Sequence, residues 1–373
     1  MLNGGRDSVD KLEKYRNIMN SRERYHAITH YEPFDRLFHW EMGPYEKTTK
    51  RWQREGMPKD KSLAELAGYD PLVGAPVNLG LIPAINYEVL DETDEYRIYR
   101  DGDGGIKKIR KDTPPPAMPQ YLRFSLQTRD DWKNDFVRRL DPNDPKRIAK
   151  NWDELKEQYR NRDYPLGVNA GSLFGWLRNW MGVENITVML YDDPAFVHEM
   201  MDYIADFVVE VLKKVVFDVD FDYAQMWEDM AYKAGSLISP KHVREFMMSG
   251  YRKITDLLHS AGIDIIMLDS DGNVEELIPL WLECGINFIY PMEVAAGMDV
   301  VQLRKKFGKD LIIGGGMDKR VLASNKDAIA EMVMSKKSVM LEGGYVPGVD
   351  HAIPPDISWE NFTYYRKLLN GIV

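Results

Sequence analysis

From about residue 164 onward the sequence alternates short runs rich in β-branched and aromatic residues with longer amphipathic runs. This pattern is typical of parallel strands joined by crossover helices, because parallel neighbours need a connection long enough to hold a helix. The predicted strands are Tyr164–Asn169, Phe221–Trp227, Ile263–Leu268, Ile286–Pro291, Leu311–Gly315 and Ser338–Glu342. Six strands that each lead into a helix fit either a (β/α) barrel or an open doubly wound sheet.

Capping signals mark where several of the helices begin. Asp193-Pro194 and Ser239-Pro240 each place a capping side chain before a proline in the first helical turn, and Ser358 precedes another helical pattern. Asn273 followed by Glu276 has the spacing of a capping box. These signals predict four helix starts, at Asp193, Ser239, Asn273 and Ser358.

The first part of the chain is less regular. Arg22–Thr29 predicts an N-terminal helix, and Leu37–Met42 predicts a buried strand that begins a barrel. Residues 86–110 alternate in polarity around turn-forming residues, which predicts a small antiparallel β-meander outside the barrel. Since (β/α) barrels often exceed the average domain length, we expect residues 1–373 to form a single domain that contains this excursion.

Composition excludes some classes of function. A net charge of -10 disfavours nucleic acids and anionic membranes as partners, because both recruit an excess of Lys and Arg. The single cysteine, Cys284, excludes an internal disulfide and any metal site that needs two thiolates from this chain. The first twenty residues contain no apolar signal-peptide core, and no apolar run is long enough to span a bilayer. A cytoplasmic location is therefore expected.

Acidic residues follow or end five of the predicted strands. They are Glu228 and Asp229, Asp269 and Asp271, Glu293, Asp318, and Glu342. In a parallel barrel the carboxyl ends of all strands share one face, so these carboxylates are expected to converge on one mouth. The alternative interpretation is that they cap helices or occupy turns, as Asp and Glu often do.

Asp269-Ser270-Asp271 is the sharpest local feature. Side chains two apart on a strand point the same way, so the two carboxylates can serve as hydrogen-bond acceptors, as a general base or as ligands of a hard cation. The alternative is a polar turn in which Asp271 and Asn273 cap the next helix.

His351 lies in an irregular loop after the last predicted strand, a position that often carries function. Neither a P-loop nor a dinucleotide-binding glycine motif is present.

An ordered series of stretches carries a family resemblance. The stretches are Pro33-Phe34-Asp35-Arg36, Gly171-Ser172-Leu173-Phe174 through Arg178 to Met181-Gly182, Tyr191-Asp192-Asp193-Pro194, Ser239-Pro240, His259 to Gly262, Asp271-Gly272-Asn273, Pro291-Met292-Glu293, Gly315-Gly316-Met317-Asp318 and Gly348 to Pro355. Together they resemble the uroporphyrinogen decarboxylase superfamily, especially its methyltransferase-like branch, which includes corrinoid-dependent methyltransferases. The resemblance extends from about residue 20 to the end and implies a (β/α)8 TIM barrel with one deep cleft.

The resemblance also implies that the chain is not a true uroporphyrinogen decarboxylase. Those enzymes hold substrate carboxylates with an M-R-Q-A-G-R motif after the first strand, where this chain has Glu41-Met42-Gly43-Pro44-Tyr45. The carboxylates of uroporphyrinogen need arginine side chains as hydrogen-bond donors, but at this position they would meet acidic groups instead. Arg178 stands where the decarboxylases have a tyrosine, and His351 aligns with the active-site histidine of the family.

Zinc-dependent methyltransferases of the same family bind metal with a His-x-Cys pair and a distant Cys. Asp269-Ser270-Asp271 occupies the position of the pair here, and Val349 that of the distant Cys. The resemblance therefore leaves an oxygen-rich site made by Asp269, Asp271, Glu293 and His351, which would take zinc or an oxygen-seeking divalent ion.

The resulting hypothesis is a methyltransferase that moves a methyl group between a small methylated compound, or another carrier, and a corrinoid on a partner protein. The catalytic residues are predicted to be His351, Asp271, Asp269 and Glu228. The substrate-binding residues are predicted to be Trp40, Glu41, Arg178, Glu293, Asp318 and Glu342. The alternatives are a decarboxylase acting on a substrate less anionic than uroporphyrinogen, and a barrel that binds a ligand without catalysis.

Overall fold

The computed structural model describes residues 18–112 and 118–372. The chain divides into two compact units, which are built from segments that alternate along the sequence. Unit 1 comprises Met1–Val73, Asn161–Gly167 and Asn287–Val373, and unit 2 comprises Gly74–Arg160 and Val168–Ile286. Strands β1 (Val73–Gly74) and β6 (Leu166–Asn169) lie where the chain passes from one unit to the other. The single domain expected from the sequence stays a prediction.

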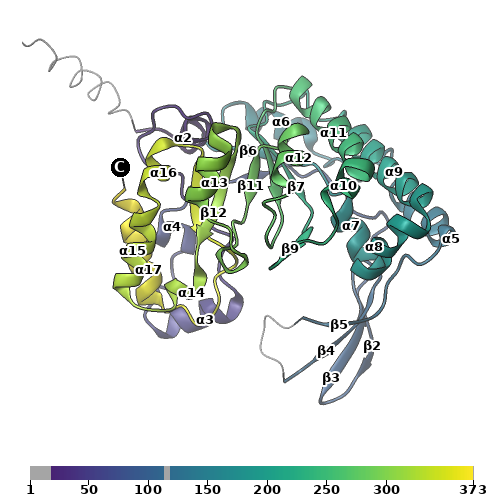
Figure 1. Ribbon diagram of the computed structural model, residues 1–373, viewed down its shortest axis with the longest axis horizontal. Helices are drawn as coiled ribbons and strands as arrows, with labels where there is room; N and C mark the ends of the chain where they lie inside the picture. The colour runs from purple at the N-terminus through teal and green to yellow at the C-terminus, as the bar shows by residue number, and fades with distance from the viewer. Residues whose placement is uncertain (1–17, 113–117, 373) are drawn as a thin grey trace, which may run out of the picture. The chain divides into compact units, whose positions relative to one another are not determined.

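Unit 1 is an α/β structure whose three strands run in parallel, with β12 between β11 and β13. Its strands are β11 (Phe288–Tyr290), β12 (Ile312–Met317) and β13 (Tyr345–Val349). Its helices are α2 (Ser21–Thr29), α3 (Glu46–Arg54), α4 (Leu63–Ala67), η3 (Val294–Ala296), α13 (Val300–Phe307), η4 (Gly308–Asp310), α14 (Lys319–Leu322), α15 (Lys326–Ser335), α16 (Lys337–Glu342) and α17 (Trp359–Asn370) (Figure 1). Almost every residue of the three strands is buried, as expected for parallel strands covered on both faces.

Unit 2 contains the parallel pair β7 and β10 and a separate antiparallel sheet in the order β2-β3-β4-β5. Its strands are β2 (Glu88–Glu92), β3 (Tyr96–Arg100), β4 (Ile106–Arg110), β5 (Gln120–Arg123), β7 (Tyr223–Trp227), β8 (Ala231–Tyr232), β9 (Gly235–Ser236) and β10 (Ile266–Asp269). Its helices are α5 (Arg129–Asp131), η1 (Trp132–Val137), α6 (Trp152–Arg160), α7 (Phe174–Met181), α8 (Val183–Asp192), α9 (Pro194–Leu212), α10 (Pro240–His242), η2 (Val243–Met247), α11 (Met248–Ser260) and α12 (Ile278–Glu283). Helices α9 and α11 pack against each other.

The predicted α/β, TIM-barrel-like class is confirmed, because parallel strands alternate with helices and an antiparallel sheet is inserted between them. The strands predicted around residues 166, 225, 267, 289 and 314 are present, as is the N-terminal helix. Local capping chemistry explains the clear helix starts. The side chain of Asp193 accepts from the Phe196 amide at 3.1 Å, with Pro194 in the first turn of α9.

Two strand predictions are wrong. Residues 338–342 belong to helix α16, and the strand that follows is β13. Gly343 and Gly344 have φ of +90° and +63°, which lets the chain leave the helix, and Pro347 made β13 resemble a loop. Glu342 therefore lies at the amino end of β13, so the strand-end argument for it as a substrate-binding residue fails.

In the segment Leu37–Met42, residues 37–39 and Glu41 are buried, but the segment forms no strand. His39 explains this, because its amide donates to the Asp70 carboxylate at 2.9 Å and its carbonyl accepts from the Asp70 amide at 2.8 Å. The side chain and the backbone amide of Asp70 thus replace a neighbouring strand as hydrogen-bond partners of His39. The capping box predicted at Asn273 and Glu276 is also wrong, because Glu276 accepts instead from the Ser236 hydroxyl at 2.6 Å and α12 begins only at Ile278.

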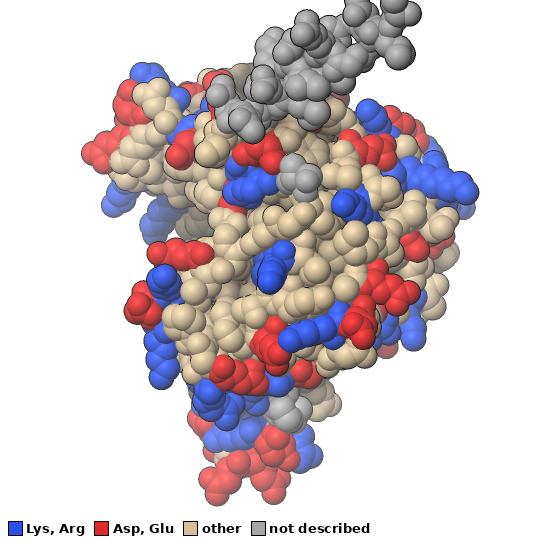
Figure 2. All heavy atoms as spheres, turned by 90° about the vertical axis from the view of Figure 1, so that its left-hand side faces the viewer, with Lys and Arg blue, Asp and Glu red and all other residues tan. Residues whose placement is uncertain are grey.

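Charged side chains of both signs are interspersed over the face in Figure 2. The longest helix that the structure describes, α9, has 19 residues and carries four acidic side chains. Over residues 18–112 and 118–372, no helix combines the length and the apolar character that crossing a membrane requires.

Candidate functional site

Three carboxylates gather at the carboxyl ends of β7 and β10 in unit 2. Asp229, Asp269 and Asp271 each offer an oxygen, and these oxygens all lie within 4.8 Å of one another. Asp269 and Asp271 share a side because they alternate with Ser270, whose buried hydroxyl accepts from the Met230 amide at 3.0 Å. The backbone of the strand end is thereby held while the two carboxylates meet Asp229.

Asp229 is held in an unusual conformation. Its φ is +51°, in the left-handed region that Asp tolerates better than most residues with a side chain. Arg178 pairs with its carboxylate at 3.0 Å and donates to its carbonyl at 2.8 Å. The Asp271 amide donates to the other carboxylate oxygen at 3.1 Å. The Arg178 guanidinium also lies 5.3 Å from the centre of the Trp227 ring, so both partners of the ion pair are fixed.

Asp229, Asp269 and Asp271 bring three acidic groups close together. Burial raises the pKa of Asp229, the charge of Asp271 raises it further, and Arg178 acts in the opposite direction. Carboxylates held this close to one another favour either a retained proton or a bound cation. Because the ligand atoms are all oxygens, the cation that fits is a hard divalent ion. The cluster can therefore donate a proton or hold such an ion.

Glu228 precedes Asp229 and has a different task. Its fully buried carboxylate accepts from the amides of Leu173, Phe174 and Gly175 at 2.8, 2.8 and 2.9 Å. These amides open helix α7, so the anion sits where the helix dipole favours it. Burial raises the pKa of Glu228, and the backbone amides oppose that rise. Glu228 thus anchors the helix that carries Arg178, and its predicted catalytic role stays a prediction.

Glycines allow the close approach of segments around the cluster. A Cβ on Gly175 would lie 2.6 Å from the Ser172 hydroxyl and 2.8 Å from the Trp227 ring. A Cβ on Gly272, where φ is +88°, would lie 2.6 Å from the backbone of Ala231. A side chain at either position would therefore force these neighbouring atoms to shift.

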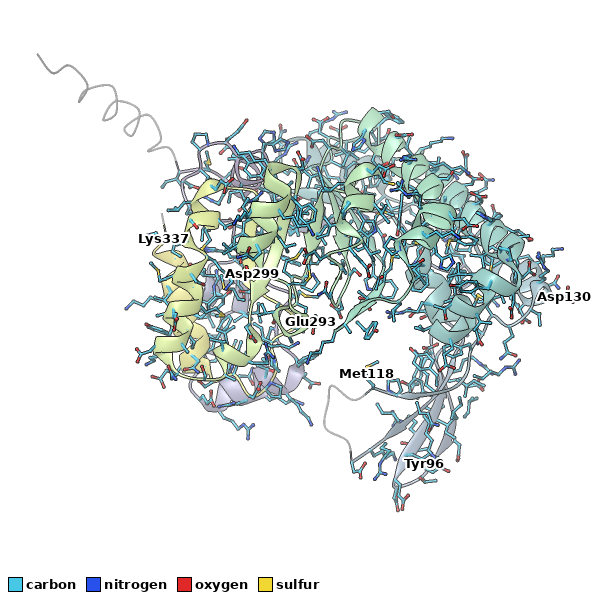
Figure 3. All side chains as sticks on the ribbon, viewed as in Figure 1. Tyr96, Met118, Asp130, Glu293, Asp299 and Lys337 are labelled. Atoms are coloured by element: carbon cyan, nitrogen blue, oxygen red, sulfur yellow. The ribbon has the colours of Figure 1, made fainter. Side chains whose placement is uncertain are left out.

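In unit 1 three predicted site residues follow neighbouring strands. Glu293 follows β11 (Figure 3), Asp318 follows β12, and His351 follows β13. Asp318 is engaged locally, since it accepts from the Arg320 guanidinium and amide, both at 2.8 Å, and so caps α14. Between β13 and His351 lies the fully buried Asp350.

Trp40 and Glu41 pack beside β13. The Glu41 carboxylate is fully buried and accepts from the Val349 amide at 2.7 Å, the Tyr365 hydroxyl at 3.0 Å and Arg366 at 3.3 Å. Burial raises the pKa of Glu41, and Arg366 opposes that rise. The Trp40 ring meets the Tyr290 ring edge-on, with 5.6 Å between their centres. The predicted substrate-binding roles of Trp40 and Glu41 stay predictions.

The structure brings together some of the predicted residues and adds one. Asp269 and Asp271 meet, with Asp229 as a third carboxylate that sequence reasoning noticed but did not assign to the site. Its position after a strand was the available signal, and its positive φ was not readable from the sequence. Because Glu293 and His351 belong to unit 1, a site shared by all four predicted metal ligands stays a prediction.

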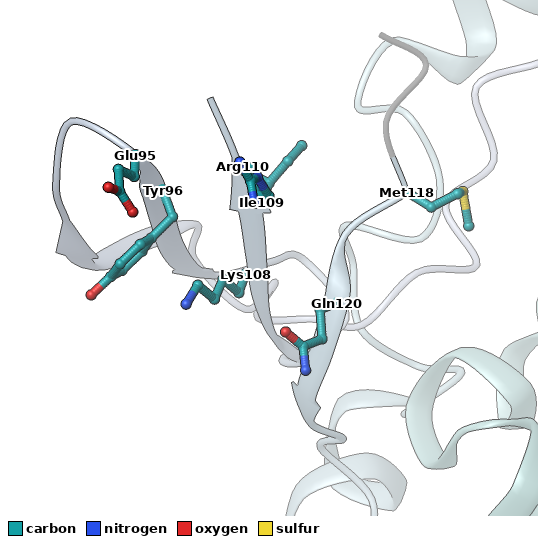
Figure 4. Close-up of a pocket in the computed structure, with 7 residues that line it drawn as sticks. All are labelled: Glu95, Tyr96, Lys108, Ile109, Arg110, Met118 and Gln120. Carbon is teal, nitrogen blue, oxygen red and sulfur yellow. The ribbon is translucent and has the colours of Figure 1, made fainter. Parts of the chain in front are cut away.

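The antiparallel sheet carries a separate hollow of about 370 Å³ (Figure 4). It is lined by Glu95, Tyr96, Lys108, Ile109, Arg110, Met118 and Gln120. None of these is a predicted site residue.

Comparison with known proteins identifies the family. Residues 108–370 match the family described as "Uroporphyrinogen decarboxylase (URO-D)". The uroporphyrinogen decarboxylase of Hydrogenovibrio crunogenus is 25% identical over 196 residues, which cover 50% of this chain and 51% of that protein. The enzyme of Hordeum vulgare is 21% identical over 192 residues, which cover 51% and 55%. The chain thus spans about half the length of the curated relatives it matches.

A solved structure described as "methyltransferase from Methanosarcina mazei" has the same fold, with a TM-score of 0.57. It is 15% identical, and the match covers 94% of this chain and 98% of that one. Since the family match includes more than half of the 373 residues, the chain belongs to the uroporphyrinogen decarboxylase family.

Proposed function

We propose that this chain is a methyltransferase that moves a methyl group between a small methylated compound, or another carrier, and a corrinoid held by a partner protein. The observation that carries the proposal is the cluster of Asp229, Asp269 and Asp271 at the strand ends of unit 2. The shared fold of the Methanosarcina mazei methyltransferase supports it.

The cluster suits the demands of methyl transfer. When a methyl group leaves an oxygen or nitrogen atom, that atom keeps the bonding electrons and needs a proton. Asp229 would donate the proton, with its carboxyl oriented by Arg178 and the Asp271 amide. The corrinoid would supply the methyl-accepting cobalt, and this chain would supply orientation and the proton.

A divalent cation is the alternative way to balance the same charges. The three oxygens favour an oxygen-seeking ion over a zinc site of the thiolate type. Metal analysis of the purified protein, before and after chelation, separates the two. A stoichiometric ion whose removal abolishes methyl transfer would assign the cluster to metal binding, and full activity without metal would assign it to proton donation.

A decarboxylase is the second candidate, and membership of the URO-D family favours it. Uroporphyrinogen itself is a poor fit. Where the decarboxylases carry their arginine motif, this chain has Glu41 to Tyr45, and Glu41 is already paired with Arg366. The second candidate is therefore a decarboxylase of a less anionic substrate.

Anaerobic spectroscopy of cob(I)alamin tests the proposal directly. Candidate donors such as methylamines, methanol and methyl ethers are added to the protein with free cob(I)alamin. We expect conversion to methylcobalamin with at least one donor. Asp206→Asn changes an exposed carboxylate of unit 2 that is paired with Lys253, and this variant should convert donors as the wild type does.

Two outcomes would contradict the proposal. The first is a folded protein that converts no donor. The second is formation of coproporphyrinogen from uroporphyrinogen at an enzymatic rate, on the order of 1 per second, which would restore the decarboxylase assignment.

A further inference from the structure

One buried carboxylate joins the loops that follow three parallel strands of unit 1. Asp350 has a relative exposure of 0% and comes directly after β13. Its Oδ2 accepts from the Val294 amide, after β11, at 3.0 Å, and its Oδ1 accepts from the Lys319 amide, after β12, at 3.2 Å. Its own amide donates to the Met317 carbonyl, the last residue of β12, at 2.9 Å.

Each position held in this way is next to a predicted site residue. Val294 follows Glu293, Lys319 follows Asp318, and Asp350 itself precedes His351. A side chain can be placed only as accurately as its own backbone, and catalytic groups tolerate little displacement. The hydrogen bonds of Asp350 therefore fix the backbone next to three candidate site residues.

We propose that Asp350 is a positioning residue, which holds the backbone of Glu293, Asp318 and His351 in the arrangement that the reaction needs. The reaction in this proposal is the methyl transfer of the proposed function, on which the proposal rests. The positioning role rests on the hydrogen bonds of Asp350. Asp350 touches no reacting atom in this proposal and acts only through the three loops.

The pattern of bonds explains why a carboxylate stands at this position. Its two oxygens each meet an N–H group from a different loop, and bonds to an ionised acceptor are stronger than neutral ones. A buried charge needs such partners, because burial without hydrogen bonds is costly. The side-chain amide of Asn has one acceptor oxygen and one NH2 donor group. In Asp350→Asn, one backbone N–H group would therefore keep its acceptor, and the other would face the NH2 donor instead.

A second buried carboxylate supports the same strand end. Glu41 accepts from the amide of Val349, the residue before Asp350, at 2.7 Å. Gly348 lets these segments approach, since a Cβ there would lie 3.0 Å from the Trp40 carbonyl. The last residues of β13 are thus fixed from two sides, and Asp350 transmits that position to the loops after β11 and β12.

The test compares Asp350→Asn and Asp350→Ala with Asp356→Asn, an exposed acid a few residues further along the same connection. Hydrogen exchange at the amides of Val294 and Lys319 reports the loops. Values of kcat and KM for cob(I)alamin and an active methyl donor report the reaction, normalised to the folded fraction. We expect faster exchange at these amides and a fall in kcat of about 10- to 100-fold, with a much smaller change in KM. Asp356→Asn should change neither.

Unchanged exchange in Asp350→Asn and Asp350→Ala would overturn the positioning role. Faster exchange with wild-type kcat would overturn it too, because the bonds would then serve stability alone. Equal loss of activity and folded fraction would likewise show a structural role. If the wild-type protein transfers no methyl group at all, the proposed function fails, while loss of exchange protection in the variants still supports the hold of Asp350 on the loops.

Discussion

The two ends of the parallel strands in unit 1 are held by opposite charges. At the amino ends, the buried guanidinium of Arg304 donates to the carbonyls of Leu311, before β12, and Gly344, before β13, at 2.9 and 2.8 Å. At the carboxyl ends, Asp350 accepts from the amides of two loops. Both arrangements satisfy a buried charge with backbone dipoles from neighbouring strands.

The difference lies in what surrounds each charge. Beside Arg304 are backbone carbonyls, the Tyr31 hydroxyl and, at 3.9 Å, the Glu342 carboxylate, whereas Asp350 lies directly before the predicted site residue His351. Unit 2 also contains buried charges of both signs that are held by backbone groups: Arg147 donates to the carbonyls of Asp141 and Asn78 at 3.0 and 3.2 Å, and Glu228 accepts from the amides that open helix α7. We therefore expect the buried arginines to act mainly on stability, and the carboxyl ends to combine stability with chemistry. Substitutions at the two ends should therefore have separable effects.

The largest expected effect is a loss of activity at the carboxyl ends of unit 2. Asp271→Asn removes one carboxylate of the cluster, and we expect kcat/KM for methyl transfer to fall by about 100- to 10,000-fold, the usual range for acid–base groups. The free energy of unfolding should stay within about 1 kcal/mol or rise, because the variant relieves like-charge repulsion. Urea denaturation and the cobalamin assay measure both. Wild-type activity in a well-folded variant would remove the cluster from the mechanism.

The next effect is a loss of stability at the amino ends of unit 1. Arg304→Met keeps an apolar side chain but leaves buried carbonyls without their donor, and we expect a loss of roughly 3–5 kcal/mol in unfolding free energy. Activity per folded molecule should not change. Arg320→Met is the control, because that arginine is 60% exposed and its ion pair with Asp318 should contribute at most about 1 kcal/mol. Equal losses of unfolding free energy in the two variants would show that burial does not increase the contribution of Arg304 to stability.

The smallest expected effect is a change in how the stability of the protein depends on pH. Asp70 accepts from Arg24 and Arg36, both at 2.7 Å, near the start of the segment Leu37–Met42. Burial alone would raise the pKa of Asp70, but hydrogen bonds from Arg36 and the His39 amide bring it below its usual value. The resulting stability is present above the unfolded pKa of about 3.9 and is lost as pH falls through the lower folded value.

Asp70→Asn should therefore be about 1–3 kcal/mol less stable at pH 7 and should lack the part of the acid dependence below about pH 4 that Asp70 supplies. Chemical denaturation between neutral and acid pH measures this difference. Asp327→Asn, an exposed acid on α15, should keep the wild-type dependence. Parallel curves for the wild type and Asp70→Asn would contradict the assignment.

Sequence reasoning succeeded where the signal was local. The pair Asp269 and Asp271 was predicted to share one side because strand alternation depends on two residues only. It failed for Glu342 and β13, because Pro347 and Gly348 disguise a strand that neighbouring β12 imposes through pairing at Gly315 and Gly316. It also failed for Leu37–Met42, where hydrophobicity predicted the burial of residues 37–39 but could not reveal that Asp70 would replace a strand partner.

By itself, the sequence determined the α/β class, the order of most strands and helices, and the presence of acids at the strand ends, because periodicity and capping act over a few residues. Only the tertiary structure decided which acids are held by amides and which carboxylates face one another. Glu228 and Asp350 accept from donors 55 and 56 residues away, at Leu173 and Val294. Asp229, Asp269 and Asp271 instead keep oxygens close together. That division depends on which loops the parallel strands bring side by side, and no local pattern encodes it.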